Sequence, residues 1–557
     1  MSGHARRAPA RPGRLSTLAL ALLLALPAWS QEAEPILEIV VERSDTLIGL
    51  SRELLVSPDA WPELARLNRL RNPDLLRPGQ ALKIPLRLLR SQPVAARLVS
   101  VSGDVRVGGQ PAAAGSNIAE GQAVETGANG SAVLELADAS RVKLAPSSLA
   151  EIAASRRYSG PERAGNPGSS AANWFAGALR VLRGSIEVFA TKVLRAKPLE
   201  VATPTAVVGV RGTQYRVNFD EAANRRTNSE VLVGAVRIEV ANTSSGADVP
   251  AGFGAALEQG ASTPTVAKMS MAPDLSGVPA LFERPLVRFG IAGEALPLRI
   301  QISPDASFDS LVLDQRFDAG AEVRIPNLAD ASWFLRARRV DKQGIEGFDA
   351  VRPFVLKARP EPPASNQPRR GAKRTVGTVD FGWTENPDAG SYRLQVSRDA
   401  DFKVLLQDRE RIDATTLRLD FDSEGQFYWR LASTRADGDR GPFGDPQSFE
   451  LRPTPTAPKG GLAEDGKSMA LAWGGREIDR HQVELARDPE FNDIVARAEL
   501  ATPEWVLPKP ERPGQYYFRY RSVEPDGFVS PYSSTLKIEV PRDWSFLWLL
   551  APLLFLL

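Results

Sequence analysis

Three segments in the C-terminal half of the chain repeat one another at matching intervals, and this repeat limits the fold more than any other feature. The segments LRIQISPDASF (298–308), YRLQVSRDADF (392–402) and HQVELARDPEF (481–491) share an alternating run, an aspartate and a phenylalanine. Aromatic segments that start at Ala331, Gly425 and Gly514 recur downstream, and both sets are 94 and then 89 residues apart. Because the interior of each copy keeps its length, we predict three copies of one domain.

Each copy alternates apolar and polar residues and places an aromatic-rich strand before an Asp-Gly turn, as antiparallel sandwiches do. The copies resemble fibronectin type III or immunoglobulin-like sandwiches, predicted at residues 279–358, 374–452 and 459–541. Ile291, Trp383 and Trp473 precede the first motif of each copy. We expect the two tryptophans to lie in the core rather than to form a platform for a ligand.

Two proline-rich linkers are expected between the copies, at residues 359–373 and 453–458. A basic cluster lies in or beside the first linker and comprises Arg369, Arg370, Lys373 and Arg374. We interpret this cluster as a solvated linker, so it gives no indication of nucleic-acid binding.

The composition excludes several kinds of chemistry. The 557 residues carry a net charge of +2, no cysteine and two histidines, His4 and His481. Disulfides, thiolate zinc sites and cysteine nucleophiles are therefore excluded, and a single histidine outside the N-terminal segment argues against Ser-His-Asp catalysis or a multi-histidine metal site. His481 lies in an alternating strand, where we expect a solvent-facing or a satisfied structural histidine. We predict no enzymatic activity, no cofactor, no metal and no nucleic-acid partner.

The N-terminus reads as an export signal. Four arginines between Arg6 and Arg14 precede an apolar run from Leu15 to Leu26, and Ala28-Trp29-Ser30 offers small residues before Gln31. The apolar run is shorter than the roughly 20 residues of a membrane span. We therefore predict a signal peptide at residues 1–30 and a mature chain in the periplasm or cell envelope.

The C-terminal segment 542–557 is a hydrophobic tail, uncharged from Trp544 onward. As a helix these last residues would extend about 21 Å, short of the roughly 30 Å hydrocarbon core of a bilayer. We expect the tail to contact a membrane, and docking into a partner protein is the alternative.

Residues 35–87 predict a small strand–helix–helix–strand module. An apolar strand at 36–41 is followed by SDTL (44–47) as a helix start, capped by Asp45 or Ser44, and by leucines at helical spacing. A second helix carries WPELARL and ends at Asn68, and Pro78-Gly79 forms a turn before the closing strand. Trp61, Leu64 and Leu67 are expected in the core.

This order of elements, with the DTL, NPD and PGQ-x-L-x-IP motifs, resembles a LysM domain. The resemblance implies binding of peptidoglycan or another N-acetylglucosamine glycan in a shallow groove between two loops. The residues that would line this groove are Ser44, Asp45, Thr46, Leu47, Asn72, Pro73, Asp74 and Leu75.

The stretch ATPTAVVGVRGTQYRVNF (202–219) is the most distinctive part of the region before the repeats. Gly209 and Gly212 flank a Val-Arg pair and predict a turn between strands. After them, Tyr215, Val217 and Phe219 alternate with Gln214, Arg216 and Asn218, as in a strand buried on one face. A second strand is expected at 231–240, with Leu232, Val236, Ile238 and Val240 on one face.

These two runs together resemble the signature of the FecR family, which implies a β-rich periplasmic domain at residues 95–268. The motif residues are Thr203, Pro204, Gly209, Val210, Arg211, Gly212 and Thr213. The founding FecR regulators carry a cytoplasmic anti-sigma segment and one membrane span before this domain. Here a signal peptide and a LysM-like module are expected instead, so direct control of a sigma factor is not expected.

Three further predictions concern the same region. We expect two strands within 130–152 joined near Asp138, an exposed loop at 156–173, and a strand pair at 179–189 that turns near Gly184.

The whole chain is predicted to be a mainly β, multidomain protein: a small βααβ LysM module, a β-rich FecR-like domain and three β-sandwich repeats. We expect a non-enzymatic envelope protein that binds peptidoglycan through LysM and serves as a periplasmic scaffold or sensor through its FecR-like domain, with a further envelope protein as a partner. One alternative is a trans-envelope signalling regulator of the iron-uptake type. Another is a glycan hydrolase, although no hydrolase motif surrounds any of the carboxylates.

Overall fold

The computed structural model describes residues 36–158, 175–191, 197–210 and 212–542. The predicted signal peptide, Arg211, the tail from residue 543 and most of the predicted loop at 156–173 lie outside these residues. The chain is 51% strand and 4% helix, which confirms the mainly β, multidomain fold class. It divides into two compact units, which are described separately below: Met1–Val278 with Phe289–Val323 and Trp333–Pro353, and Pro279–Arg288 with Arg324–Ser332 and Phe354–Leu557.

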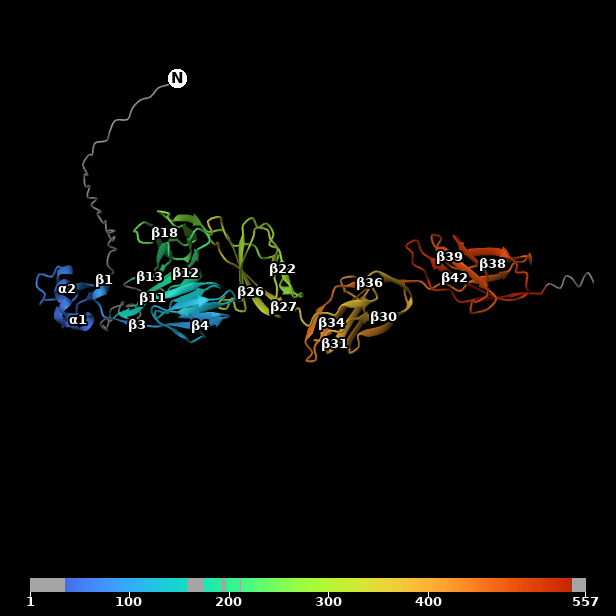
Figure 1. The fold of residues 1–557 in the computed structure, drawn as a ribbon, viewed down its shortest axis with the longest axis horizontal. Helices are drawn as coiled ribbons and strands as arrows, with labels where there is room; N and C mark the ends of the chain where they lie inside the picture. The colour runs from blue at the N-terminus through green and yellow to red at the C-terminus, as the bar shows by residue number, and fades with distance from the viewer. Residues whose placement is uncertain (1–35, 159–174, 192–196, 211, 543–557) are drawn as a thin grey trace, which may run out of the picture. The chain divides into compact units, whose positions relative to one another are not determined.

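The first unit begins with the predicted strand–helix–helix–strand module (Figure 1). Its elements are β1 (Ile36–Val40), α1 (Leu47–Leu54), α2 (Trp61–Leu67) and β2 (Ala81–Pro85), with short 3₁₀ turns at Pro58–Ala60 and Leu86–Leu88. Antiparallel pairing of β1 with β2 makes a two-stranded sheet, and the helices bury Leu47, Leu50, Leu54 and Leu64 against it. These leucines stand at helical spacing because one stripe of α1 must face the sheet.

The predicted cap of the first helix was wrong. Thr46 is the N-cap residue, and its hydroxyl accepts a hydrogen bond from the Gly49 N–H at 3.0 Å. Asp45 instead accepts from the Glu42 N–H at 2.7 Å. The helix begins at Leu47, so the capping position falls one residue later than the sequence pattern suggested.

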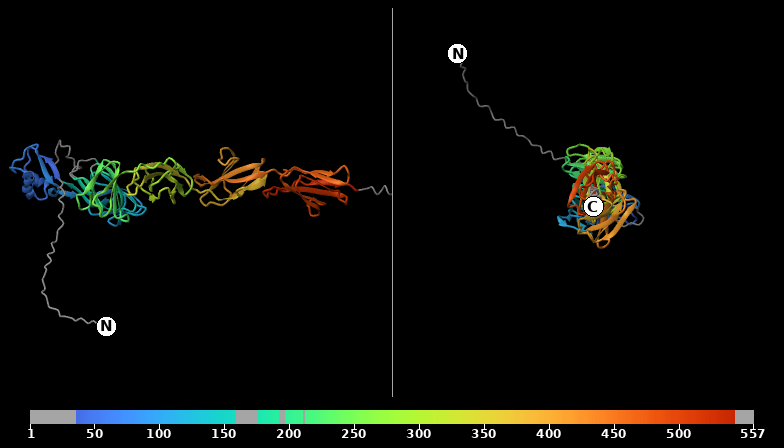
Figure 2. Two further views of the ribbon diagram at one scale, coloured as in Figure 1. Left: turned by 90° about the horizontal axis from the view of Figure 1, so that it is seen from above. Right: turned by 90° about the vertical axis from the view of Figure 1, so that its right-hand side faces the viewer.

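The middle of the first unit is formed by strands β3 to β20, which hydrogen-bond into one closed circuit. Their bounds are β3 Ser91–Pro93, β4 Ala96–Ser102, β5 Val105–Val107, β6 Gln110–Pro111, β7 Asn117–Ile118, β8 Ala123–Thr126, β9 Ser131–Glu135, β10 Arg141–Leu144, β11 Leu149–Tyr158, β12 Phe175–Phe189, β13 Leu199–Ala202, β14 Ala206–Val210, β15 Gln214–Asp220, β16 Arg226–Val233, β17 Ala235–Val240, β18 Gly246–Pro250, β19 Phe253–Leu257 and β20 Thr265–Lys268. Figures 1 and 2 show these strands in blue to green. Their inward-facing residues form one large apolar core.

The segment 179–189 is not a strand pair but part of the single long strand β12. The strand passes through Gly184, whose φ is +82°. Before Gly184 it pairs with β11 and β13, and after Gly184 it pairs with β10 and β15. A Cβ at Gly184 would lie 2.7 Å from the Ser148 Cα, so glycine allows β12 to bend closely past Ser148 and to serve two parts of the sheet.

Three other strand predictions need correction. Gly209 lies inside β14, and the turn comes after Val210, with Gly212 at φ +61°. The run 231–240 is two strands, β16 and β17, joined at Gly234. Val231 rather than Leu232 is therefore fully buried in the main core. Within 130–152, β9 and β10 are joined near Asp138 as predicted, and β11 also begins there and continues through residues 156–158.

The remaining part of the first unit comes from the first repeat. β23 (Leu298–Ser303) lies between β24 (Leu313–Phe317) and β26 (Ala331–Arg339) in an antiparallel sheet. The other strands of this repeat are β21 Leu281–Phe282, β22 Val287–Phe289, β25 Val323–Ile325 and β27 Ala350–Leu356.

The second unit holds two complete sandwiches. In the second repeat, sheet β28-β30-β33 packs with sheet β29-β36-β34-β31-β32, and β35 pairs with β34. In the third repeat, sheet β37-β38-β41 packs with sheet β40-β39-β42-β43. The bounds are β28 Ser365–Gln367, β29 Ala372–Thr375, β30 Gly377–Trp383, β31 Ser391–Ser397, β32 Leu405–Ile412, β33 Thr416–Phe421, β34 Gly425–Thr434, β35 Arg440–Phe443, β36 Gln447–Arg452, β37 Lys459–Leu462, β38 Ser468–Ala472, β39 Arg480–Ala486, β40 Ile494–Leu500, β41 Glu504–Pro508, β42 Gly514–Val523 and β43 Leu536–Val540.

Trp383 and Trp473 are both buried in these cores, as predicted. His481 is also fully buried, 5.7 Å from the Trp473 ring, so it is a structural and not a solvent-facing histidine. The predicted linker at 359–373 is partly wrong, because β28 and the start of β29 lie within it and pair with strands of the second sandwich.

The repeated aspartate and phenylalanine build the same corner in each copy. Phe308, Phe402 and Phe491 all adopt positive φ, at 57°, 57° and 59°. In each copy the aspartate three residues earlier accepts hydrogen bonds from backbone N–H groups of the loop that follows; these aspartates are Asp305, Asp399 and Asp488. An arginine covers each phenylalanine ring at about 4 Å, namely Arg336, Arg430 and Arg519. The repeated aspartate and phenylalanine thus mark a corner that backbone hydrogen bonds and an arginine–phenylalanine contact stabilise in every copy.

Candidate functional site

Two loops of the small module carry the residues predicted to bind glycan. The first loop, 41–46, joins β1 to α1, and the second, 68–80, joins α2 to β2. They are hydrogen-bonded to each other: the Val41 N–H donates to the Gln80 carbonyl at 2.9 Å, and the Gly79 N–H donates to the Val41 carbonyl at 2.8 Å. The structure therefore joins the two predicted groups of residues on adjacent loops.

Most of the predicted glycan-binding residues are accessible. Ser44, Thr46, Asn72 and Asp74 are exposed, and Leu75 is 65% exposed. Asp45 and Pro73 are half-buried. Leu47 is 1% exposed in the module core, so its side chain supports α1 and does not reach the surface.

The loops are braced by their own polar side chains. Besides the Thr46 and Asp45 contacts, the Asn72 Oδ1 accepts from the Asp74 N–H at 3.0 Å. Asn68, which sequence reasoning treated only as a helix end, ties α2 to β2: its Nδ2 donates to the Leu64 and Lys83 carbonyls, and its Oδ1 accepts from the Lys83 N–H. An asparagine directly after a predicted helix was the available signal for this contact.

The FecR-like motif residues support the strands around them. Thr203 is buried, and its hydroxyl accepts from the Ala206 N–H at 2.9 Å and contacts the Thr227 hydroxyl at 2.7 Å. Pro204 is exposed at this turn, Val210 and Thr213 are buried, and Gly209 and Gly212 are half-buried. Arg211 lies outside the described residues.

Arg216 marks a second and unexpected feature, a buried charge cluster within the first unit. The alternation of β15 predicted that this side chain faces away from a half-buried strand, yet it is 2% exposed. The first repeat covers that face: the Arg216 guanidinium donates to the Gly347 carbonyl at 3.0 Å and pairs with Asp349 at 3.0 Å. β15 is therefore buried on both faces.

The cluster joins the FecR-like strands to the first repeat through charged groups. Its members are Glu187, Arg216, Glu230, Arg299, Asp314, Arg336, Arg338, Glu346 and Asp349. Arg299 donates to Glu346 at 2.6 Å and to Asp314 at 2.6 and 2.7 Å, and Arg338 donates to Glu346 at 3.0 Å. Arg336 pairs with Glu187 at 3.4 Å.

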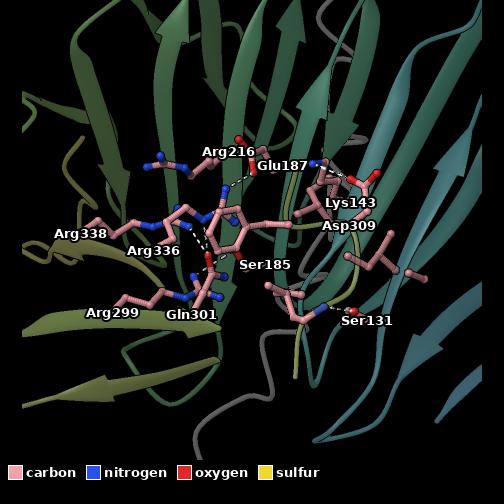
Figure 3. Close-up of a pocket in the computed structure, with 16 residues that line it drawn as sticks. Ser131, Lys143, Ser185, Glu187, Arg216, Arg299, Gln301, Asp309, Arg336 and Arg338 are labelled. Atoms are coloured by element: carbon pink, nitrogen blue, oxygen red, sulfur yellow. Dashed lines mark hydrogen bonds and ion pairs between the residues drawn. The ribbon is translucent and has the colours of Figure 1, made fainter. Parts of the chain in front are cut away.

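Figure 3 shows Arg299, Arg336 and Arg338 extending from one side of a small cavity, with Glu187 and Lys143 on the other. The cavity holds about 20 Å³, room for about one water molecule. Lys143 closes the far side through an ion pair with Asp309 at 2.7 Å. The arrangement can hold two domains together but has no room for an organic substrate.

The buried carboxyl groups titrate very differently. Burial raises the pKa of Glu230 to about 7, and the negative charge of Glu346 adds to the rise. Burial also opposes ionisation of Glu346, but Arg299, Arg338 and Arg216 outweigh it and hold its pKa well below the ordinary range. Burial, followed by the charge of Arg338, lowers the pKa of Arg336 to about 10. With Glu230 protonated, four guanidinium groups face four carboxylates.

Sequence reasoning missed the cluster residues of the first repeat. One signal was available: Arg336 and Arg338 stand two apart on one face of a strand, whereas the second copy carries Ala432 at the position of Arg338. A charged pair that breaks the repeat pattern can mark an interface of that copy alone.

No metal-binding group of three or more acidic or histidine residues occurs in the described ranges. Likewise, none of the helices in that part of the chain is long and apolar enough to cross a membrane.

Fold and loops together define a multidomain β protein with one small helical module that presents two adjacent loops. Family models identify two of its domains: residues 39–85 match the LysM domain and residues 122–237 match the FecR protein family. The chain thus contains a LysM domain and a FecR domain, as the sequence motifs predicted. No curated protein matches.

Among solved structures, the chain is similar to a protein assigned as an anti-sigma factor from Parabacteroides distasonis, with 13% identity, 26% of this chain, 59% of that chain and a TM-score of 0.20. It is also similar to the chicken CNTN1 FN1–FN3 domains, with 12% identity, 47% and 96% coverage and a TM-score of 0.20. The fibronectin(III)-like modules of Clostridium thermocellum CbhA match with 12% identity, 32% and 93% coverage and the same TM-score. The chain thus spans less than two thirds of the first of these proteins.

Proposed function

We propose that this protein is a non-enzymatic component of the cell envelope that binds peptidoglycan, or another N-acetylglucosamine glycan, through its LysM domain. The observation that carries the proposal is the pair of hydrogen-bonded loops at Val41, Gly79 and Gln80, which expose the residues of the LysM motifs. N-acetylated sugars need small polar groups, backbone hydrogen bonds and an apolar contact. Ser44, Thr46 and the exposed Leu75 offer such groups on a braced backbone.

We further propose that the FecR domain and the first repeat act together as a scaffold or sensor for a protein partner. The buried charge cluster supports this reading, because it leaves a cavity of only about 20 Å³ and so favours recognition at the outer surface. The match to the FecR family keeps a second candidate open, a regulator in trans-envelope signalling. Binding to an anti-sigma protein would distinguish that candidate from a passive scaffold.

The glycan proposal is tested by cosedimentation of the exported protein with purified sacculi. The full chain is expected to sediment, and a chain lacking residues 35–86 is expected to remain in solution. A point variant gives a sharper test: Leu75→Ser removes an exposed apolar side chain from the second loop, and Val56→Ser removes one of equal exposure, 67%, outside both loops. Leu75→Ser should weaken sedimentation and Val56→Ser should not. Equal sedimentation of all four proteins would disprove glycan binding by this module.

A further inference from the structure

The loop that follows α2 is rich in unpaired positive charge. Arg69, Arg71 and Arg77 are all exposed, and Asp74 is the only acidic residue between them. Within the described part of the chain, none of the three guanidinium groups makes a hydrogen bond or an ion pair. Many other arginines of the first unit do pair, including Arg87 with Glu63 and Arg156 with Glu120. These three side chains are available to an external ligand.

Arg69 also occupies a backbone position that favours glycine. It follows the C-cap Asn68 of α2 at φ +52°. The Arg69 N–H donates to the Arg66 carbonyl and the Leu70 N–H to the Ala65 carbonyl, which is the usual way a helix ends in the left-handed conformation. A side chain at this position strains the backbone, and glycine would relieve the strain. The fold therefore gives no reason for an arginine here.

The three arginines bracket the predicted glycan contacts. Arg71 directly precedes Asn72, Arg69 lies three residues before it, and Arg77 follows Leu75 by two residues. The same loop is fixed at its start by Asn68 and at its end by the hydrogen bonds to Val41. Along the loop, residues Asn72 to Leu75 therefore have an exposed arginine before and after them.

We propose that Arg69, Arg71 and Arg77 bind carboxylates of peptidoglycan, so that this LysM domain selects an anionic glycan over neutral chitin. The inference rests on the proposed glycan binding and specifies its substrate class. Guanidinium groups match carboxylates in geometry and charge, and the stem peptides of intact peptidoglycan supply carboxylates. The muramyl lactyl carboxyl is amide-bonded to the stem peptide and becomes a carboxylate only where an amidase has removed that peptide. Because the side chains are exposed, the contribution is screened by salt.

The test measures binding of the full-length protein to three probes: intact sacculi, the glycan strands that an amidase releases from them by removing the stem peptides, and neutral chitohexaose. The variants are Arg69→Gly, Arg71→Gln and Arg77→Gln, with Arg52→Gln as the control, since Arg52 is an exposed arginine on α1. Each loop variant should lose up to about fivefold in affinity for intact sacculi at low salt, and less at high salt. Binding to chitohexaose should be unchanged.

Arg69→Gly separates a ligand role from a structural one. Hydrogen exchange of the α2 amides should become slower in this variant, because the strain is relieved, while binding to intact sacculi becomes weaker. If the loop variants bind intact sacculi as tightly as Arg52→Gln does, the proposal is overturned and glycan binding itself stands. If the wild-type protein binds none of the probes, the proposed function fails as well. Loss of the variant effect on the amidase-released strands shows that the arginines bind only stem-peptide carboxylates, and its persistence shows that they also bind the lactyl carboxylates that the amidase has freed.

Discussion

Four guanidinium groups and five carboxyl groups share one closed region of the first unit, and a single proton on Glu230 balances their charges. Taking charges out of water is costly, and the cost is recovered only when every member keeps its partner. Glu346 is the central acceptor, since it receives hydrogen bonds from both Arg299 and Arg338. Removing this one carboxylate would leave two buried cations short of a partner.

Replacing Glu346 with glutamine is therefore expected to destabilise the first unit by about 3–5 kcal/mol. The measurement is the opening free energy of β16 and β26 from hydrogen exchange, which reports this region apart from the rest of a multidomain chain. Glu239→Gln is the matched control, because Glu239 pairs with Arg237 at the surface. The substitution Glu239→Gln should lower the opening free energy by less than about 1 kcal/mol. Equal losses for the two variants would contradict a central role of Glu346.

The stability of the same region should depend on pH through Glu230. Its pKa is about 7 in the folded protein against an ordinary 4.5, so the folded state retains a proton that the unfolded chain has lost. The stabilisation from this group is complete below pH 4.5 and is lost as the pH rises through 7. Glu346, Arg216 and Arg338 face Glu230. The lowered pKa of Glu346 and the raised pKa of Arg338 keep these two groups charged across this range.

Hydrogen exchange of β16 between about pH 5 and pH 8 checks this expectation. The wild-type opening free energy should fall by up to about 3 kcal/mol as the pH rises, and Glu230→Gln should remove most of that fall. A variant with the same pH dependence as the wild type would show that Glu230 is not the titrating group.

At the scale of elements, two equivalent positions in different repeats can differ in burial. Leu311 and Leu405 are equivalent, 94 residues apart. Leu311 is 4% exposed and its N–H donates to the Ser131 hydroxyl of β9, whereas Leu405 is 37% exposed at the start of β32. The same corner is covered in the first copy and open in the second.

The substitution Leu311→Ala is expected to lower the free energy of unfolding by about 2–5 kcal/mol, because it leaves a cavity in a packed region. Leu405→Ala should change stability by no more than about 0.5 kcal/mol. The comparison uses hydrogen exchange of β23 in the first variant and of β31 in the second. A large effect at Leu405 would mean that this corner is also covered in solution.

The periodicities of the sequence predicted much of the fold. The offsets of the repeats showed that Phe308, Phe402 and Phe491 are equivalent, and the leucine spacing located α1. Alternation along β15 correctly placed Tyr215, Val217 and Phe219 in the core. Alternation could not show that Arg216 is buried. A polar residue on the outer face of a strand gives the same sequence pattern whether that face contacts solvent or another domain.

The other wrong strand predictions came from glycines, because a glycine can mark a turn, a bend or an ordinary strand position. Gly184 bends one strand, Gly234 separates two, and Gly209 lies within β14. Only tertiary pairing distinguishes these cases. For the candidate site, the motif order predicted which loops adjoin, but the bracing by Asn68 depends on its reach to β2.

At the scale of the molecule, the FecR domain and the first repeat are expected to fold as one body. A fragment of residues 91–268 would expose Glu187, Arg216 and Glu230, together with the apolar contact of Ala256 with Met269 and Ile345. We expect this fragment to aggregate or to give poorly dispersed NMR spectra, and a fragment of residues 91–358 to be well folded. A monomeric 91–268 fragment with well-dispersed spectra would refute this expectation.

The charge cluster also bears on how the gene can change by recombination. The second copy carries Lys403 where the first has Asp309, and Phe443 where the first has Asp349, so it offers the FecR domain neither the partner of Lys143 nor the carboxylate that pairs with Arg216. An unequal crossover that fuses the second copy directly to the FecR domain would bring Lys403 against Lys143 and leave the buried Arg216 without its carboxylate partner. Crossovers between the second and third copies leave the FecR domain and the first copy unchanged. Recombination can therefore add or remove copies at the C-terminal side of the array, whereas the first copy cannot be exchanged for another.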